Sequence, residues 1–135
     1  TIDGDEACVA NVGDSRLYLL GDKITQITKD HSWVEEMVKK GELTESQARI
    51  HPQKNIITRA LGIDEVVHAD YFEIDVKPDD KILMCSDGLT NMVEDEDIEY
   101  IIRHSSSIEK AVENLVEKAN ENGGKDNITV ILVQI

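Results

Sequence analysis

The chain has 135 residues, of which 40% are hydrophobic, 31% charged and 4% aromatic, as expected for one globular domain large enough to bury a core. Its formal net charge of −14 argues against nucleic-acid binding, which requires a basic face. No apolar run approaches the ~20 residues of a membrane span. Cys8 and Cys85 lie in separate apolar runs without Cys-x-x-Cys spacing. We expect both cysteines to be buried. Two isolated thiols fit a protein of the reducing cytoplasm better than a disulfide scaffold, although the sequence does not exclude a disulfide between them.

The first third of the chain is typical of an antiparallel meander. Asp3-Gly4-Asp5 is a strong hairpin signal, and residues 7–12 form the next predicted strand. Because little chain precedes that hairpin, we expect strand 7–12 to have an unpaired edge, which favours pairing with another chain. The apolar runs 17–20 and 24–28 extend the meander across a Gly-Asp turn.

Two helices and an alternating strand follow. Ser32 with Glu35, and Thr44 with Gln47, have capping-box spacing and predict helices that end at Gly41 and just before Pro52. Residues 66–76 alternate between apolar and polar side chains, which predicts a half-buried strand.

The stretch 81–90 is the most informative. Ile82 to Cys85 form a short apolar run, which predicts a buried strand, and Asp87-Gly88 stands at the exit of that strand. A carboxylate held at the end of a rigid strand suits a hard divalent cation. The alternative is that Asp87 only caps a helix that starts near Leu89. Gly88 is expected to supply the backbone freedom of the turn.

Two helices and a final strand complete the chain. The first is marked by Ile98, Ile101 and Ile102. The second has a six-residue apolar stripe within 108–119 and is expected to be capped by Ser106 with Glu109. The last strand spans 128–135. Grouped strands with segregated helices predict an α+β fold with mainly antiparallel sheets.

Three strand-rich runs each carry an aspartate beside glycine at one end: Asp14, Asp87 and Asp126. If those ends converge, the three residues form a carboxylate cluster. Clustered carboxylates repel one another unless cations lie between them. For Asp14, the alternative is a turn residue that binds the backbone of Ser15 and Arg16.

Five motifs, in order and spacing, resemble the metal-dependent protein serine/threonine phosphatases of the 2C type, bacterial branch. They are Asn11-Val12-Gly13-Asp14-Ser15-Arg16, Lys29-Asp30-His31-Ser32, Thr58-Arg59-Ala60-Leu61-Gly62, Ser86-Asp87-Gly88-Leu89-Thr90 and Gly124-Lys125-Asp126-Asn127-Ile128-Thr129. The resemblance covers essentially the whole chain and implies a four-layer α-β-β-α sandwich. The family's N-terminal strands and helix, its arginine, its Glu-Asp pair and its Asp-Gly-x-Gly-Gly segment have no counterpart. We therefore expect residues 1–135 to be a single domain truncated at its N-terminus.

The resemblance also implies roles for individual residues. Asp87 and Asp126 would bind the first of two Mn²⁺ or Mg²⁺ ions, and Asp14 with Asp87 a third, weaker one. Asn127 and Gly88 would support this site, and a metal-activated water would be the nucleophile. No phosphate-binding residue is identified, because the family's arginine for this role lies in the absent part.

The other basic and His-containing motifs are expected to be structural. A guanidinium matches phosphate oxygens, but we expect Arg16 and Arg59 to form ion pairs instead. Asp30-His31-Ser32 should form a turn and a helix cap. The four scattered histidines are interpreted as surface or packing residues.

The resemblance implies a cytoplasmic enzyme. The intact parent would hydrolyse phosphoserine and phosphothreonine in proteins, including a serine/threonine kinase. Because one side of the metal cage is missing, we expect the chain alone to bind divalent ions weakly and to be weakly active or inactive. The alternative is a non-catalytic, phosphatase-like interaction module that self-associates through its open sheet edge.

Overall fold

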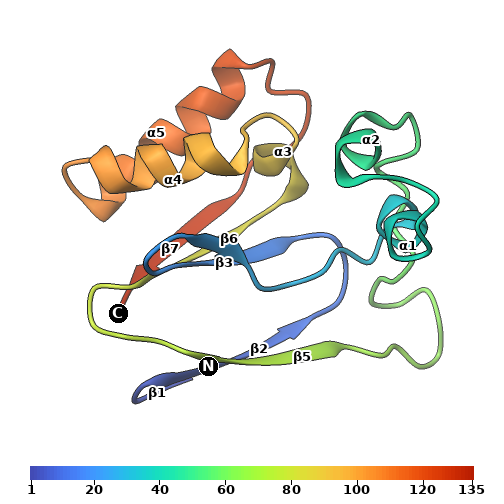
Figure 1. The fold of residues 1–135 in the computed structure, drawn as a ribbon, viewed down its shortest axis with the longest axis horizontal. Coiled ribbons are helices and arrows are strands. Elements are labelled where there is room, and N and C mark those ends of the chain that lie inside the picture. Colours follow the sequence, from blue (N-terminus) through green and yellow to red (C-terminus); the bar gives the residue numbers. More distant parts are fainter.

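The computed structural model describes residues 1–135 and has the predicted α+β architecture, with two antiparallel sheets and five helices (Figure 1). The strands are β1 (Ile2–Asp3), β2 (Glu6–Asn11), β3 (Arg16–Leu20), β4 (Ile24–Gln26), β5 (Asp70–Asp75), β6 (Lys81–Cys85) and β7 (Val130–Gln134). The helices are α1 (Trp33–Lys39), α2 (Glu45–Ile50), α3 (Asp87–Thr90), α4 (Asp95–His104) and α5 (Ile108–Glu121).

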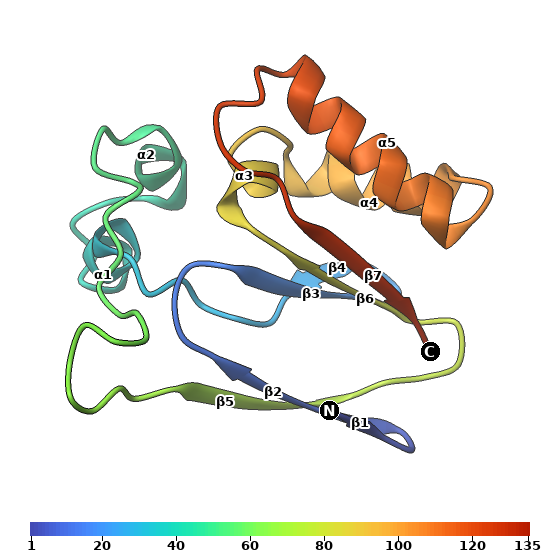
Figure 2. The ribbon, with the colours of Figure 1, turned by 180° about the vertical axis from the view of Figure 1, so that it is seen from behind.

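The two sheets face one another. One has the strand order β1-β2-β5 and the other β4-β3-β6-β7, and every pairing is antiparallel. Helices α3, α4 and α5 lie over the outer face of the four-stranded sheet, whereas α1 and α2 stand beside one end of both sheets (Figures 1 and 2). The outer face of the three-stranded sheet carries no helix in this chain.

The four-stranded sheet separates two apolar cores, because successive side chains of a strand point to opposite faces. On one face, Leu17 and Ile82 pack with Ala7 and Val76 between the two sheets. On the other face lies a larger cluster of 11 buried residues shared with the helices. Its members are Tyr18, Leu20, Leu83, Cys85, Leu89, Val93, Ile98, Ile102, Ala111, Leu115 and Ala119. β6 lies between β3 and β7 in this sheet, and its C-terminal end leads into α3.

Local sequence signals predicted several elements well. The hydroxyl of Ser32 accepts the Glu35 N–H at the start of α1, and Thr44 forms a complete capping box with Gln47 at α2. The alternation in residues 66–76 is present in β5, which spans Asp70–Asp75 with alternate residues exposed.

Three expectations were wrong in detail, and a fourth holds in part. Strand β2 is paired along its whole length by β5 on one side, but on the other side β1 reaches only Glu6 and Ala7, so the predicted open edge is present beyond them. Three helices, not two, follow β6, because a one-turn helix precedes α4. The hydroxyl of Ser107, not Ser106, caps α5 by accepting the Lys110 N–H. Cys8 is exposed, because its side chain points away from the inter-sheet core, whereas Cys85 is buried; both are free thiols.

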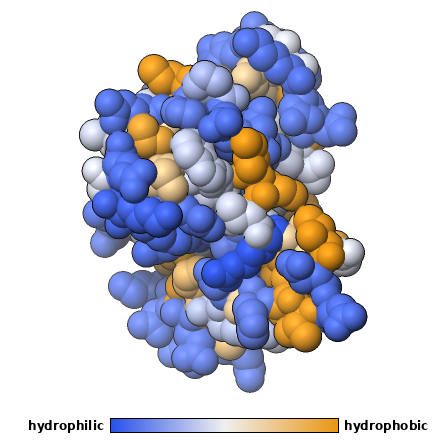
Figure 3. Space-filling view, turned by 90° about the vertical axis from the view of Figure 1, so that its right-hand side faces the viewer, coloured by the Kyte–Doolittle hydropathy of each residue, from blue (hydrophilic) through white to orange (hydrophobic).

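The segment 51–69, between α2 and β5, has little regular structure. It exposes several large apolar side chains, among them Leu61 at 78%, Val66 at 69% and Ile63 at 68% of their surface. Figure 3 views this side of the molecule and shows apolar side chains in a band among polar ones. None of the helices combines the length and apolar character that crossing a membrane requires.

Candidate metal centre

Asp87 stands where β6 ends and α3 begins, as its position in the sequence predicted. It is the first residue of α3, and Ser86 is the N-cap without a side-chain capping bond. The carboxylate of Asp87 accepts a hydrogen bond from Asn91 Nδ2, one turn on, at 3.3 Å. Asp87 therefore opens a helix without acting as its cap, and its carboxylate has no cationic side chain as a hydrogen-bonded partner.

Asp126 lies in the α5–β7 connection, which packs directly against the start of α3. The hydroxyl of Ser86 donates to the carbonyl of Asn127 at 2.9 Å and accepts the Thr129 N–H at 3.0 Å. Asn127 donates its own N–H to the Asp126 carboxylate at 2.7 Å. These bonds hold the Asp126 loop beside Asp87 although about forty residues separate them.

Gly88 has a different role from the one the sequence suggested. It lies within helix α3, and its backbone is not in the left-handed region. A Cβ atom at this position would lie 2.9 Å from the carbonyl carbon of Asn127 and closer still to its oxygen. The residue must therefore lack a side chain so that the Asp126 loop can approach α3.

Asp14 lies in the connection between β2 and β3, where the chain crosses from one sheet to the other. His31 makes two hydrogen bonds to Gly13, the residue before Asp14. The His31 backbone N–H donates to the Gly13 carbonyl at 2.9 Å, and His31 Nδ1 accepts the Gly13 N–H at 3.1 Å. The other ring nitrogen of His31 pairs with Asp70 at 3.0 Å. His31 is thus a buried positioning residue for the Asp14 turn.

The three carboxylates are electrostatically coupled through Asp87. Burial raises the pKa of Asp87, and the negative charge of Asp126 raises that pKa further. Burial also raises the pKa of Asp14, with the charge of Asp87 as the second cause. None of the three forms a salt bridge with a lysine or arginine. The three aspartates predicted from the sequence thus lie near enough for their charges to act on one another through Asp87.

The three aspartates do not form one compact three-ligand cluster. The only three potential ligands whose atoms all lie within 4.8 Å of one another are Glu6, Cys8 and Glu73, exposed on β2 and β5. Asp14, Asp87 and Asp126 are thus too far apart for a single ion to be bound directly by all three. Among the three, the charge of Asp126 raises the pKa of Asp87, and the charge of Asp87 raises the pKa of Asp14. Oxygen-only ligands suit Mn²⁺ or Mg²⁺ better than zinc.

The two arginines in the motifs form ion pairs, as expected. Arg16 makes a bidentate pair with Asp30, at 2.9 Å from Nε and 2.8 Å from Nη2. Arg59 pairs with Asp70 at 2.9 Å and also donates to the His68 carbonyl. Both guanidinium groups are therefore occupied by the protein itself.

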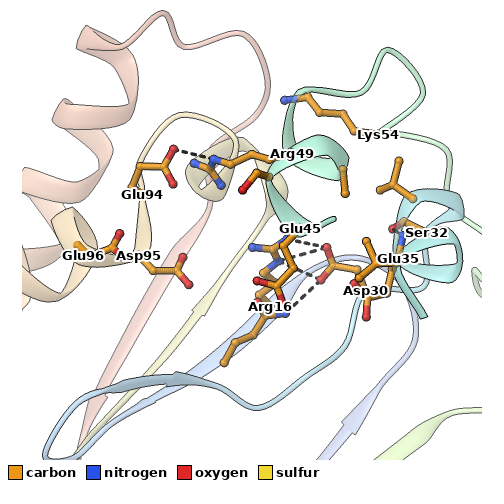
Figure 4. Close-up of a pocket in the computed structure, with 15 residues that line it drawn as sticks. Arg16, Asp30, Ser32, Glu35, Glu45, Arg49, Lys54, Glu94, Asp95 and Glu96 are labelled. Carbon is orange, nitrogen blue, oxygen red and sulfur yellow. Dashed lines mark hydrogen bonds and ion pairs between the residues drawn. The ribbon is translucent and has the colours of Figure 1, made fainter. Parts of the chain in front are cut away.

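A polar cleft of about 580 Å³ lies between α1–α2 and the start of α4. In Figure 4, Glu94, Asp95 and Glu96 approach it from α4, and Arg16 with Asp30 lies at its centre. Arg49, on α2, spans the cleft to Glu94 at 2.7 Å. Lys54 follows α2 and also lines the cleft. No local sequence pattern singled out His31 or Ser86 for a role at the site.

Comparisons with known proteins identify the family. Residues 1–128 match the family model described as protein phosphatase 2C. The chain belongs to the protein phosphatase 2C family. It is 45% identical over 130 residues to "Serine/threonine phosphatase stp" of Listeria innocua. The matched region covers 96% of this chain and 52% of that relative.

Solved phosphatase 2C-type structures agree with the fold. Stp1 from Staphylococcus aureus aligns with a TM-score of 0.95 and 40% identity over 99% of this chain and 53% of that one. The catalytic domain of PstP, in complex with two manganese ions, aligns with a TM-score of 0.87 and 34% identity, covering 98% and 55%. The chain thus spans about half the length of the relatives it matches.

Proposed function

We propose that this chain supplies one side of the metal centre of a protein serine/threonine phosphatase, and that Asp87 and Asp126 bind one Mn²⁺ or Mg²⁺ ion while Asp14 and Asp87 bind another. The observation that carries the proposal is the coupling of three unpaired carboxylates through Asp87. Similarity to bacterial serine/threonine phosphatases, one of them solved with two manganese ions, supports it.

The residues of this chain fix the carboxylates in advance of metal binding. Ser86 and Asn127 hold Asp126 beside α3, and His31 holds the turn that carries Asp14. When bound, divalent ions supply charge neutralisation and a water of lowered pKa for attack on a phosphoester. Because positioned charges provide most of the catalysis in such a reaction, displaced carboxylates would reduce the rate strongly.

We propose phosphoserine and phosphothreonine proteins, including a serine/threonine kinase, as substrates of the intact protein in the cytoplasm. Two free cysteines fit that reducing compartment. The chain alone is expected to bind divalent ions weakly and to hydrolyse phosphoesters barely or not at all.

The test is manganese-dependent hydrolysis of p-nitrophenyl phosphate and of a phosphothreonine peptide. We expect little turnover by the chain alone and recovered turnover after addition, in trans, of the N-terminal half of a relative. Asp87→Asn should abolish the recovery. Normal turnover by the chain alone at roughly millimolar Mn²⁺, or activity that survives both EDTA and Asp87→Asn, would contradict the proposal.

A second candidate function is self-association, and two observations favour it. Residues Val9 to Asn11 of β2 pair with β5 but extend past β1, so one edge stays open there. Beside it, an apolar cavity of about 360 Å³ between the sheets reaches Met84 and Ile131, which are 37% and 51% exposed. A second copy would add a strand to this edge. Analytical ultracentrifugation tests this, and a monomer at all concentrations would exclude it.

A further inference from the structure

Asp70 holds two neighbouring side chains at once, one with each of its carboxylate oxygens. It is the first residue of β5, and its partner in β2 is Asn11, so it lies beside the strand end that leads into the Asp14 turn. One carboxylate oxygen lies 3.0 Å from His31 Nε2, and the other accepts a hydrogen bond from Arg59 Nη1 at 2.9 Å. Asp70 therefore joins the buried histidine to the segment that follows α2.

The hydrogen bonds of His31 determine where its ring proton lies. The backbone N–H of Gly13 can only donate, so His31 Nδ1, at 3.1 Å from it, accepts that bond and carries no proton. A neutral imidazole then bears its one proton on Nε2, which faces the carboxylate of Asp70. Only 3% of the His31 side chain is exposed, so water cannot readily replace either partner.

A salt bridge between a protonated His31 and Asp70 does not fit these contacts. Protonation would place a hydrogen on Nδ1, and this hydrogen and the Gly13 N–H would then be two donors without an acceptor. Arg59 Nη1 also lies 3.3 Å from Nε2, so a positive charge on the ring would stand next to a guanidinium group. Asp70 thus orients a neutral ring.

We propose that Asp70 is a positioning residue of the candidate metal centre, because it fixes the tautomer of His31 in which Nδ1 can hold the turn that carries Asp14. The inference rests on the proposed function, in which Asp14 and Asp87 bind one of the cations. A carboxylate that accepts the proton of a buried imidazole decides which ring nitrogen stays free. In this chain the free nitrogen holds the backbone beside a proposed metal ligand.

Replacement of Asp70 by asparagine separates this role from general stability. The asparagine side chain has one acceptor oxygen, whereas Arg59 and the Nε2–H of His31 both need an acceptor there. When the oxygen faces the permanently charged Arg59, the amide NH₂ faces Nε2, which then has to accept. The ring proton moves to Nδ1, and the hydrogen bond from the Gly13 N–H is lost.

The experiment compares the 135-residue chain with three variants by nuclear magnetic resonance. Long-range ¹H–¹⁵N spectra distinguish the two neutral tautomers of His31, and hydrogen exchange of the Gly13 amide reports on the turn. Asp75→Asn is the matched control for Asp70→Asn, since Asp75 is exposed at the opposite end of β5. The double variant Asp70→Asn/Arg59→Met removes the guanidinium, so that the asparagine oxygen is free to accept the Nε2–H.

We expect the Nε2–H tautomer in wild type and in Asp75→Asn, the Nδ1–H tautomer in Asp70→Asn, and a return to Nε2–H in the double variant. Exchange of the Gly13 amide should become about tenfold faster in Asp70→Asn, the effect of losing one hydrogen bond to a buried group, and should recover in the double variant. A purely structural role predicts the reverse, because the second substitution would then add to the damage.

An unchanged tautomer in Asp70→Asn, or no recovery in the double variant, would overturn the inference. If Asp70→Asn fails to fold, a double variant that folds with the Nε2–H tautomer supports the inference, and one that also fails to fold overturns it.

A Mg²⁺ titration tests the link to the metal centre separately, with the chemical shifts of the Asp14 and Asp126 amides as reporters. Asp70→Asn should raise the half-saturating Mg²⁺ concentration about tenfold at Asp14 but not at Asp126. Equal values at Asp14 in Asp70→Asn and wild type would count against the positioning role. A wild-type chain in which Mg²⁺ shifts neither amide would overturn the proposed metal centre and the role of Asp70 in it, whereas an unchanged His31 tautomer would leave that centre standing.

Discussion

Replacing Gly88 by alanine tests whether close packing of the Asp126 loop against α3 builds the site. The added methyl would lie 2.9 Å from the Asn127 carbonyl carbon and nearer its oxygen, so the loop must move. Overpacking of this kind costs about 1–3 kcal/mol. The better helix propensity of alanine offsets at most about 1 kcal/mol, because α3 is a single turn. The net destabilisation should be about 1–2 kcal/mol, which lowers the Tm by about 3–6 °C.

The same displacement should weaken Mn²⁺ binding by about tenfold or more, since it moves Asp126 away from Asp87. Gly4→Ala is the control: Gly4 has φ of 62° with nothing within 4 Å of a Cβ, so alanine strains a distant turn only. It should lower the Tm without changing Mn²⁺ affinity. The assays are urea denaturation and Mn²⁺ titration. A Gly88→Ala chain with wild-type stability and wild-type Mn²⁺ affinity would refute the reasoning.

Three further predictions concern charge and reactivity. Burial and the charge of Asp126 raise the pKa of Asp87 in the folded metal-free chain above its unfolded value. The protonated carboxyl of Asp87 therefore adds to the free energy of unfolding below pH ~3.8, and this contribution is lost as pH rises through the raised pKa. Asp87→Asn should therefore be more stable than wild type at pH 7 but not at pH 3 in urea denaturation, and Mn²⁺ should raise the Tm of wild type only. Arg16→Ala leaves Asp30 half-buried without its ion-pair partner and should lower the free energy of unfolding by about 3 kcal/mol. Arg16→Lys should recover only part of this loss, because lysine cannot bind the carboxylate in a bidentate manner. A loss below about 0.5 kcal/mol for Arg16→Ala would contradict the structural role of this pair. In a thiol-labelling assay with Ellman's reagent, the exposed Cys8 should react at once. Cys85 is buried, which raises its pKa to about 12, and it should react only after unfolding. Two fast-reacting thiols would count against the fold.

Local patterns predicted those elements whose signals lie within a few residues. The caps at Ser32 and Thr44 set the starts of α1 and α2, and the alternation of apolar residues marked β5 as half-buried. Ser107 competed with its neighbour Ser106 as the cap of α5, and a sequence pattern cannot separate adjacent hydroxyls that both precede an apolar stripe.

The hydrogen bonds that hold the site's loops in place could not be predicted from the sequence, for a different reason. Ser86 bonds to the Asn127 carbonyl forty-one residues away, and His31 binds the Gly13 backbone across eighteen. These contacts join loops that meet only when both sheets are assembled. The burial of Cys8 was mispredicted because an apolar run does not say which of its alternating side chains faces the core.

By itself the sequence determined the family and the α+β class and singled out three candidate aspartates, because these depend on residue types and on short spacings along the chain. The tertiary structure alone decided that Asp87 couples separately to Asp126 and Asp14, that Gly88 makes room for a loop, and that His31 lies between Gly13 and Asp70. The physical reason is that charge coupling and close approach depend on distances through space, which are set by how the strands pack and not by their order.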